Sequence, residues 1–151
     1  MPFWLMKSDS YFIQDLQRDK KTCWDGVRNF QARNFMRDQM KVGDLVLFYH
    51  SNAEPSGVAG IAKVCRTAYP DFSAWDPKDK HYDPRSTPQK PLWRMVDLEF
   101  VEKFEHFVSL DELRKEPLLK EMLVLKRGMR LSVQPVEEKH FKRVREMGQG
   151  S

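Results

Sequence analysis

The sequence predicts one α+β domain folded around a curled β-sheet. Its 151 residues match the usual size of a single domain and are enough to bury one core without a disulfide or a metal ion. Hydrophobic residues make up 40% of the chain, which is typical of a globular protein and too apolar for intrinsic disorder. Strand and helix patterns are mixed, without regular alternation and without a repeat of about 20 to 50 residues. This mixture favours α+β over a parallel α/β sheet or a solenoid.

The first part of the chain predicts a strand followed by two helices. Residues 3–6 form a compact apolar run that ends at polar residues, which indicates a buried strand and a turn. Ser10 is placed to cap a short helix, which we expect to end near Asp19. A glycine turn at Gly26 then leads into a second helical pattern that continues to Arg37.

A β-hairpin and a long loop come next. Residues 45–49 and 58–64 have strand patterns, and the turn-rich residues 50–57 join them, which predicts a hairpin. Residues 69–91 contain five prolines as well as large aromatic side chains such as Trp75. Because linkers rarely hold large aromatic residues, we expect a long ordered loop or a lid here.

The last third of the chain returns to strands and helices. Residues 93–107 alternate well enough for a long strand. Ser109 and Glu112 have the spacing of a capping box, which predicts a short helix that ends at Lys115. Pro117 is expected to begin one more helical turn.

The chain is expected to close with a strand, a helix and a frayed end. Residues 129–133 have the pattern of a last strand, and residues 137–147 that of an amphipathic helix. We expect residues 1–147 to form the folded domain and residues 148–151 to be a disordered tail, because the tail has nothing to pack.

Charge and composition limit the possible settings. The net charge of +4 permits nucleic-acid binding without requiring it. No apolar run approaches the length that spans a bilayer, so we expect no membrane partner and a cytoplasmic location, or a nuclear one if the source is eukaryotic. Cys23 and Cys65 lack the spacing of a zinc or redox pair, so two free thiols are expected.

The sequence offers little that suggests catalysis. It contains no glycine-rich phosphate loop, no HExxH, no CxxC and no nucleophile elbow. Asp76, Asp79 and Asp83 lie near His81, but hard-cation loops have a denser and more regular oxygen pattern, so a solvated acidic loop is the better interpretation. We therefore expect no catalytic residues, no metal site and no cofactor.

Hydrogen-bonding residues stand beside aromatic or basic residues near the predicted strand ends. These groups are Lys7 and Ser8, then Trp24 with Arg28, Asn29 and Arg33, then His50 with Ser51 and Asn52. Proteins hold a nucleobase by stacking it on an aromatic face and by hydrogen bonds to its edge. The alternative is that Trp24 is a core residue and the arginines are surface charges, which is the more frequent situation for such a pattern alone.

Several long stretches resemble the EVE-domain family. They are residues 3–8, 24–34, 42–52, 57–64, 68–71 and 130–136, and the resemblance extends over nearly all of residues 2–147. It implies a PUA-like fold, a small mixed β-barrel with flanking helices. The same superfamily includes YTH and SRA-type domains, which read modified bases, and EVE domains are regarded as readers of modified bases in DNA or RNA.

The resemblance also implies a set of site residues. The implied base-binding pocket is Lys7, Ser8, Trp24, Asn29, His50 and Ser51, and the implied phosphate-binding residues are Arg28 and Arg33, with Lys7 also near the backbone. The second aromatic wall of a YTH pocket has no clear counterpart, and Tyr69, Trp75 or Trp93 could supply it. Methylated adenine and modified cytosine therefore both stay open.

The sequence thus predicts a non-catalytic module that binds DNA or RNA and holds a flipped, modified base in an aromatic pocket. One alternative is a nucleotide-processing enzyme with His50 as general base, although no second acid or metal is evident. The other alternative is a module that binds a protein or a small anionic ligand. The oligomeric state stays open.

Overall fold

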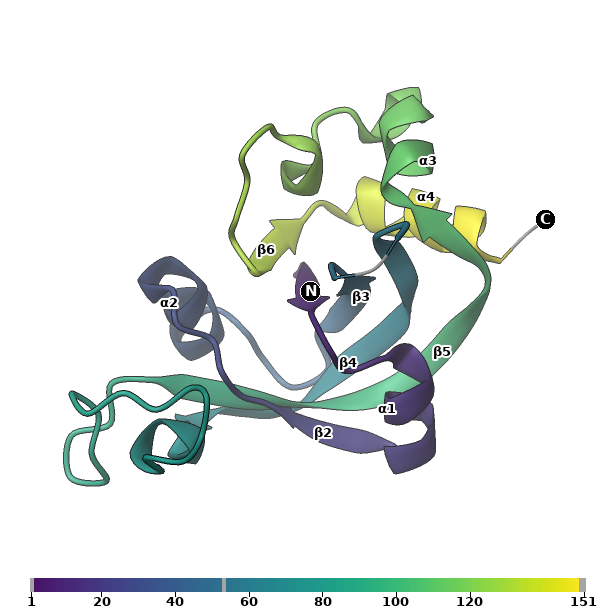
Figure 1. The fold of residues 1–151 in the computed structure, drawn as a ribbon. Coiled ribbons are helices and arrows are strands. Elements are labelled where there is room, and N and C mark those ends of the chain that lie inside the picture. The colour runs from purple at the N-terminus through teal and green to yellow at the C-terminus, as the bar shows by residue number, and fades with distance from the viewer. Residues whose placement is uncertain (1, 53, 150–151) are drawn as a thin grey trace.

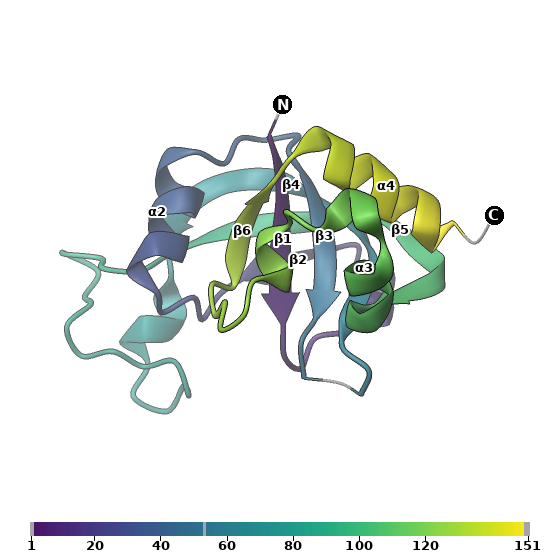
Figure 2. The ribbon, with the colours of Figure 1, turned by 90° about the horizontal axis from the view of Figure 1, so that it is seen from above.

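The computed structural model describes residues 2–52 and 54–149, in which six strands form one curled sheet (Figure 1). The strands are β1 (Phe3–Ser8), β2 (Lys21–Trp24), β3 (Leu45–His50), β4 (Gly57–Pro70), β5 (Arg94–Ser109) and β6 (Val133–Val136). Their order across the sheet is β2-β5-β4-β3-β1-β6. β1 runs parallel to β3, and the other neighbouring pairs are antiparallel, so the sheet is mixed (Figure 2).

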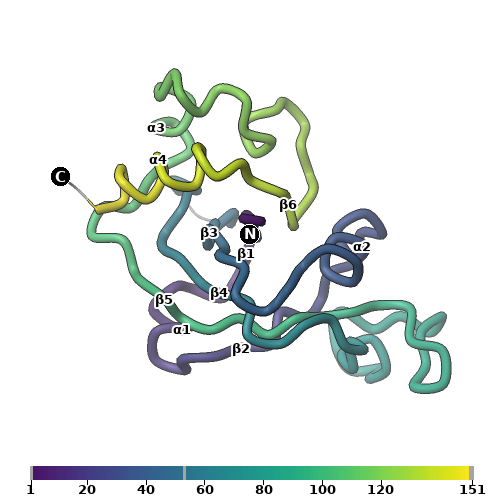
Figure 3. Tube along the Cα trace, turned by 180° about the vertical axis from the view of Figure 1, so that it is seen from behind, coloured from purple at the N-terminus to yellow at the C-terminus, as the bar shows by residue number. Residues whose placement is uncertain are grey.

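Within the described residues the sheet stays open. β2 pairs with β5, β6 pairs with β1, and no ladder joins β2 to β6. Helix α2 (Phe30–Asp38) lies near this opening and contacts β4, β5 and β6 (Figures 1 and 3). The α+β class is confirmed, whereas the closed barrel is not, because each edge strand has only four residues and α2 lies close to the gap between them.

Helices cover both faces of the sheet. The other helical segments are α1 (Ile13–Asp19), α3 (Leu110–Lys115) and α4 (Glu138–Gly148), with 3-10 turns η1 (Phe72–Trp75), η2 (Pro117–Leu119) and η3 (Leu123–Leu125). Because side chains alternate along a strand, Trp4 and Met6 of β1 join the apolar cluster that contains α1 and α2 residues. Leu5 joins the second cluster, with α3 and α4. None of the described helices is long and apolar enough to cross a membrane.

Many predicted elements are confirmed. The first strand, the hairpin of β3 and β4, the long strand β5 and the closing helix α4 lie where the patterns placed them. Ser109 caps α3, since its hydroxyl accepts a hydrogen bond from the Glu112 N–H at 3.2 Å. Pro117 begins η2, and Phe141 and Val144 of α4 are buried.

The start of α1 differs from the prediction. Ser10, the expected cap, lies outside the helix, whose N-cap is Phe12. The Asp15 carboxylate accepts a hydrogen bond from the Phe12 N–H at 2.9 Å, so a residue of the helix itself provides a partner for the backbone N–H at the N-cap. Ser8 holds the preceding turn, because its hydroxyl donates to the Tyr11 carbonyl at 2.7 Å and accepts from the Tyr11 N–H at 3.2 Å.

The two edge strands were not predicted where they occur. β2 was missed because its charged first residue, Lys21, indicated the end of a helix. Pairing with β5 defines this strand, with Cys23 opposite Asp97. β6 begins at Val133, whereas a strand was expected over residues 129–133.

The shift of β6 has a local cause. Lys7 donates its backbone N–H to the Ser132 carbonyl at 2.9 Å and its Nζ to the Met129 carbonyl at 3.2 Å. These bonds hold residues 129–132 beside the end of β1 as an irregular segment, and regular pairing with β1 starts only at Val133 opposite Met6.

The long loop and the chain end also depart from the expected bounds. Tyr69 and Pro70 extend β4, and after η1 the loop that leads to β5 projects beyond the sheet (Figures 1 and 3). Gly148, expected in the tail, is the last residue of α4. A Cβ added there would stand 2.3 Å from the Phe104 ring, so Gly148 packs closely on that ring. Residues 150–151 of the expected tail lie outside the described residues.

The cap assignment can be tested by stability measurements. Ser109→Ala removes the side-chain acceptor of α3 and is expected to lower the free energy of unfolding by about 1 kcal/mol. The matched variant Ser10→Ala removes an exposed hydroxyl at the wrongly predicted cap and is expected to change it by less than about 0.5 kcal/mol. Urea titration of both variants measures the difference, and equal losses would contradict the assignment.

Candidate nucleic-acid interface

A cleft of about 1000 Å³ opens at the ends of β1 and β2. We call it the β1–β2 cleft. Its walls come from five parts of the chain: the end of β1 and the turn after it, the end of β2 and the segment that follows, the residue after β3, the loop before β5, and the irregular segment before β6. The lining residues are Lys7, Ser8, Asp9, Ser10, Tyr11, Thr22, Cys23, Trp24, Asp25, Gly26, Val27, Arg28, Ser51, Lys78, Asp79, Lys80, His81, Met129, Arg130 and Ser132.

Trp24 is both a wall of the cleft and a core residue. It is the last residue of β2 and lies opposite Val96 of β5, a pairing that fixes its position. Its indole meets the Phe48 ring edge-on, with centroids 5.5 Å apart at 86°, and 8% of the residue is exposed. The two interpretations of Trp24 that the sequence allowed are therefore compatible, since packing holds the indole at the wall of the cleft.

The predicted Lys7, Ser8 and Ser51 also line the cleft. Burial lowers the pKa of Lys7. Ser51 donates its hydroxyl to the Asp9 carboxylate at 2.8 Å, and the Ser8 carbonyl lies 3.2 Å from the same hydroxyl oxygen. Its backbone N–H donates to the same Ser8 carbonyl at 2.9 Å, so the end of β1 and the residue after β3 are tied together. The cleft thus has a fixed floor that carries hydroxyl and ammonium groups.

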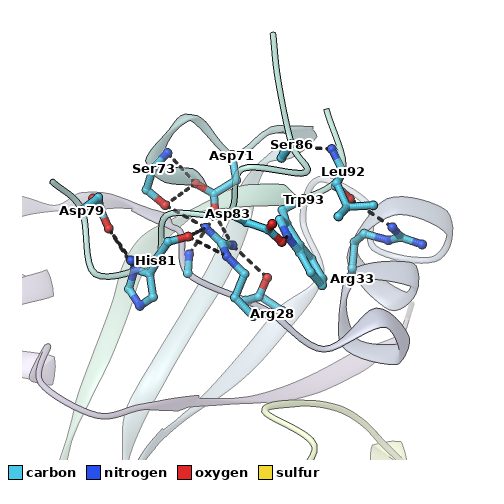
Figure 4. A network of polar contacts seen from close by, with 12 residues as sticks. Arg28, Arg33, Asp71, Ser73, Asp79, His81, Asp83, Ser86, Leu92 and Trp93 are labelled. Atoms are coloured by element: carbon cyan, nitrogen blue, oxygen red, sulfur yellow. Dashed lines mark hydrogen bonds and ion pairs between the residues drawn. The ribbon is translucent and has the colours of Figure 1, made fainter. Parts of the chain in front are cut away.

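Arg28 lines the cleft, but its guanidinium is bonded to other groups of the protein (Figure 4). It forms a 2.9 Å ion pair with Asp71 and donates to the His81 carbonyl at 2.8 and 3.0 Å. It also donates to the Val27 carbonyl at 3.0 Å and the Ser73 hydroxyl at 3.2 Å. These bonds join the segment after β2 to the loop before β5, and they occupy the donors that a phosphate would need.

Asp71 is the buried acceptor of this network. Burial alone would raise the pKa of Asp71. Hydrogen bonds from the Ser73 hydroxyl at 2.6 Å and the Gly26 N–H at 2.8 Å, together with the Arg28 ion pair, overcome this effect and lower the pKa below its usual value. The carboxylate therefore remains charged and holds the cleft wall at neutral pH.

Asn29 and Arg33 do not line the cleft. The Asn29 side chain accepts a hydrogen bond from the Ala32 N–H at 2.9 Å and so caps α2. The Arg33 guanidinium donates to the Leu92 carbonyl at 3.0 Å (Figure 4). It also lies over the Phe30 ring, 4.9 Å from its centroid. Both side chains hold structural positions around α2.

His50 lies beside the cleft without lining it. The residue is 4% exposed, and its ring lies 4.2 Å from the Phe12 ring, centroid to centroid. Neither ring nitrogen has a hydrogen-bond partner in the described part of the chain. A general base needs contact with its substrate, and this buried ring does not reach the cleft.

None of the three residues considered for a second aromatic wall lines the cleft. The Tyr69 hydroxyl donates to Asp97, and the Trp93 indole N–H donates to Asp83 at 2.8 Å. The aromatic residue that joins Trp24 at the cleft is Tyr11, which the sequence assigned to the predicted helix. Burial, and then its 2.7 Å hydrogen bond to Asp19, raise the pKa of Tyr11 to about 12. Its hydroxyl is neutral at physiological pH.

Asp25 is a cleft residue that sequence reasoning missed, although it directly follows Trp24. It is exposed, and its carboxylate makes no hydrogen bond or ion pair with another described residue. Partial burial in the cleft, followed by the nearby Asp71 carboxylate, raises the pKa of Asp25. This group is free to accept hydrogen bonds from an amino group.

The acidic residues of the long loop are used locally. Asp79 accepts from the His81 N–H at 2.8 Å, and Asp83 accepts from the Arg85 side chain at 2.9 Å. No group of three or more His, Cys, Asp or Glu side chains suited to a metal ion occurs in residues 2–52 and 54–149.

The chain belongs to the EVE-domain family, because the family model for the EVE domain matches residues 2–147. Among its relatives is thymocyte nuclear protein 1 of Rattus norvegicus, which is 42% identical over 160 residues that cover 92% of this chain and 70% of the relative. The resemblance that the sequence indicated is therefore confirmed.

Solved structures agree with this assignment. A hypothetical protein from Leishmania major has a TM-score of 0.93 and 43% identity, and the match covers 99% of this chain and 95% of that one. The human THYN1 protein, solved in complex with 5-methylcytosine containing DNA, has a TM-score of 0.91 and 38% identity, with 100% and 99% covered. One relative of known structure is thus a complex with modified DNA.

The Arg28–Asp71 pair predicts a pH-dependent stability. Asp71→Asn is expected to lower the free energy of unfolding by about 3 kcal/mol at neutral pH, because it leaves Arg28 without its buried partner. Since the folded pKa of Asp71 is lowered, its contribution is complete above the unfolded pKa of about 3.9 and disappears as pH falls through the folded value.

The measurement is urea unfolding of wild type and variant between pH 2 and pH 7. The difference in free energy of unfolding between the two proteins should narrow below about pH 4. Asp111→Asn serves as the control, because that side chain is 82% exposed and 3.9 Å from its partner. A difference in free energy of unfolding that stays constant from pH 2 to pH 7 would contradict the assigned role of Asp71.

Proposed function

We propose that this protein is a non-catalytic reader of a modified base in DNA, and that it holds the base, flipped out of its strand, in the β1–β2 cleft. The observation that carries the proposal is the cleft itself, where an aromatic wall at Trp24 stands next to Lys7, Ser8 and Ser51. Its volume of about 1000 Å³ is ample for one nucleotide. The complex of the human THYN1 protein with 5-methylcytosine containing DNA favours modified DNA as the ligand.

The energetics fit a modest affinity. Extruding a base costs a few kcal/mol, and least where the base is already weakly paired or single-stranded. Stacking on one aromatic side chain returns about 1–3 kcal/mol, so edge hydrogen bonds and backbone contacts must supply the rest. In this proposal Lys7 donates to the base or its sugar, and the Ser8 and Ser51 hydroxyl oxygens, whose protons are used within the protein, accept from it. Asn29 and His50 support the segments that form the cleft.

In this proposal Asp25 makes the cleft prefer cytosine over thymine. Cytosine offers a 4-amino donor, for which a carboxylate is a suitable acceptor, whereas thymine offers a carbonyl oxygen at the same position. The Asp25 carboxylate is exposed at the cleft and has no other partner among the described residues. We assign it to the 4-amino group of a flipped cytosine, with a methyl group on that ring stacked near Trp24.

Binding is favoured over catalysis by the position of His50. This histidine was the candidate general base, yet its ring is buried and outside the cleft.

A reader of DNA would act where DNA is, which is the nucleus of a eukaryotic cell or the cytoplasm of a bacterial one. RNA that carries the same modified base is the matched competitor in a binding test.

Trp24→Ala is expected to weaken binding to a 5-methylcytosine oligonucleotide by about 5- to 150-fold, which corresponds to the loss of one stacking contact. Because Trp24 packs in the core, Trp24→Phe is the second variant; it keeps the fold and should bind between wild type and alanine. Fluorescence anisotropy with a labelled oligonucleotide measures binding, and circular dichroism selects folded protein.

The matched control for Trp24 is Trp93→Phe. It disturbs a buried tryptophan that stacks on Phe30 and does not line the cleft. This variant should bind like the wild type. Folded Trp24→Ala protein with wild-type affinity for every oligonucleotide would rule out the proposed pocket.

Asp25→Ala should remove discrimination between 5-methylcytosine and thymine, two bases that share the 5-methyl group and differ in the 4-amino group, which thymine replaces with a carbonyl and a proton on N3. The wild type is expected to prefer the 5-methylcytosine oligonucleotide by about 10-fold or more, the usual value of a charge-assisted hydrogen bond. Competition binding with oligonucleotides that differ at this one base measures the ratio. A variant that retains the preference would show that another group reads the base edge.

A further inference from the structure

A second concave surface adjoins the β1–β2 cleft. This groove of about 610 Å³ runs between the start of α3 and the turn after η3. Its floor is apolar and includes the buried Tyr49 and Val124. Its rim carries basic side chains and, in the described residues that line it, no carboxylate. We call this surface the basic groove.

The charge of the basic groove is concentrated, and four of its five basic residues are exposed. The basic lining residues are Lys7, Arg114, Lys126, Arg127 and Arg130. These are five positive charges on one surface of a chain whose net charge is +4. Like charges held together on a surface repel one another, so the groove is stabilised when an anion occupies it.

Most arginine donors of the basic groove are not used by the protein itself, in contrast to those of Arg28. Among the described residues, Arg127 and Arg130 make no side-chain hydrogen bond or ion pair, and both are exposed. Arg114 has one distant partner, Asp111 at 3.9 Å, and Lys126 has one at 3.7 Å from Glu121. Exposed pairs at these distances contribute little, so the donors remain available.

The turn that carries these charges is held at both ends. The Met129 N–H donates to the Lys126 carbonyl at 3.1 Å, and the Met129 carbonyl accepts from Lys7 Nζ at 3.2 Å. Gly128 has a φ of 75°, a conformation that favours glycine, and a Cβ there would meet no atom within 4 Å. The turn therefore presents Arg127 to solvent on a fixed backbone.

The basic groove and the β1–β2 cleft adjoin each other and share lining residues. Lys7, Met129 and Arg130 line both, so they form the ridge between them. A strand whose base enters the cleft would have its neighbouring phosphates at this ridge. Phosphodiesters spaced along a strand fit a row of free arginine and lysine side chains.

We propose that the basic groove binds the phosphodiester backbone of the strand next to the flipped nucleotide. This inference rests on the proposed function, and it moves backbone binding from Arg28 and Arg33, whose donors are used internally, to Arg114, Arg127 and their basic neighbours. Arg28 and Arg33 fix the shape of the cleft and its surroundings, while the groove supplies sequence-independent affinity and sensitivity to salt.

The test compares Arg114→Gln/Arg127→Gln with Lys103→Gln/Lys139→Gln. Both double variants remove two exposed positive charges, but Lys103 and Lys139 line neither surface. Binding of a single-stranded 5-methylcytosine oligonucleotide is measured between 50 and 300 mM salt. Free 5-methyl-2′-deoxycytidine, which has no phosphate, is titrated in parallel by NMR.

The groove variant should bind the oligonucleotide about tenfold more weakly at low salt, and the slope of log K against log salt should fall by about 1.4, or about 0.7 for each lost contact. Its affinity for the nucleoside should not change. The slope of log K against log salt for the control variant should stay closer to the wild-type slope than that of the groove variant. A groove variant that matches the control in both slope and affinity would overturn the proposal.

The two proposals fail in different ways. If Trp24→Ala abolishes the preference for the modified base while the groove variant behaves like the control, the groove assignment is wrong and the reader remains. If the groove variant loses salt-dependent binding while Trp24→Ala binds normally, the reader is wrong, and the groove remains only as a site for the phosphodiester backbone. Groove-dependent binding to phosphatidylserine vesicles, without an effect on oligonucleotides, would overturn the choice of a nucleic-acid partner.

Discussion

The fold depends on a sheet that curls but does not close in the described part of the chain. β4 and β5 are long and bend through several shifts of register, which brings the two edges of the sheet toward each other. Both edge strands are short, and α2 lies against the sheet near the opening. The β1–β2 cleft has walls from β2 and from the segment that leads into β6, so the open sheet gives this protein its concave surface.

The arginines of this molecule fall into two groups, those bonded within the protein and those whose donors are available to a ligand. Arg28 meets a fully buried carboxylate and several carbonyl and hydroxyl oxygens, and it joins two distant segments into one wall. Arg127 projects from an exposed turn and has no side-chain partner in the described residues. The number of donors already satisfied inside the protein distinguishes a structural arginine from one that is available to a ligand.

Local patterns predicted the elements whose signals are local. The cap at Ser109, the hairpin of β3 and β4 and the apolar face of α4 depend on residues close in sequence, and they are confirmed. β2 was missed because it is a strand through its pairing with β5, 72 to 78 residues away along the chain. The cleft was predicted only in part for the same reason. Lys7, Ser8, Trp24, Arg28 and Ser51 meet there. Asp25, Met129, Arg130 and Ser132 become wall residues through tertiary placement that no local pattern records.

In the proposed complex a methylated cytosine leaves its strand and stacks near Trp24. The most direct measurement is the NMR signal of an oligonucleotide that carries one 5-methylcytosine with a ¹³C-labelled methyl group. A methyl group close to the face of an indole experiences the ring current, so a large upfield shift is expected at saturation, reduced in Trp24→Phe and unchanged in Trp93→Phe. A methyl signal that stays at its free position while the oligonucleotide is bound would show that the base does not occupy the cleft.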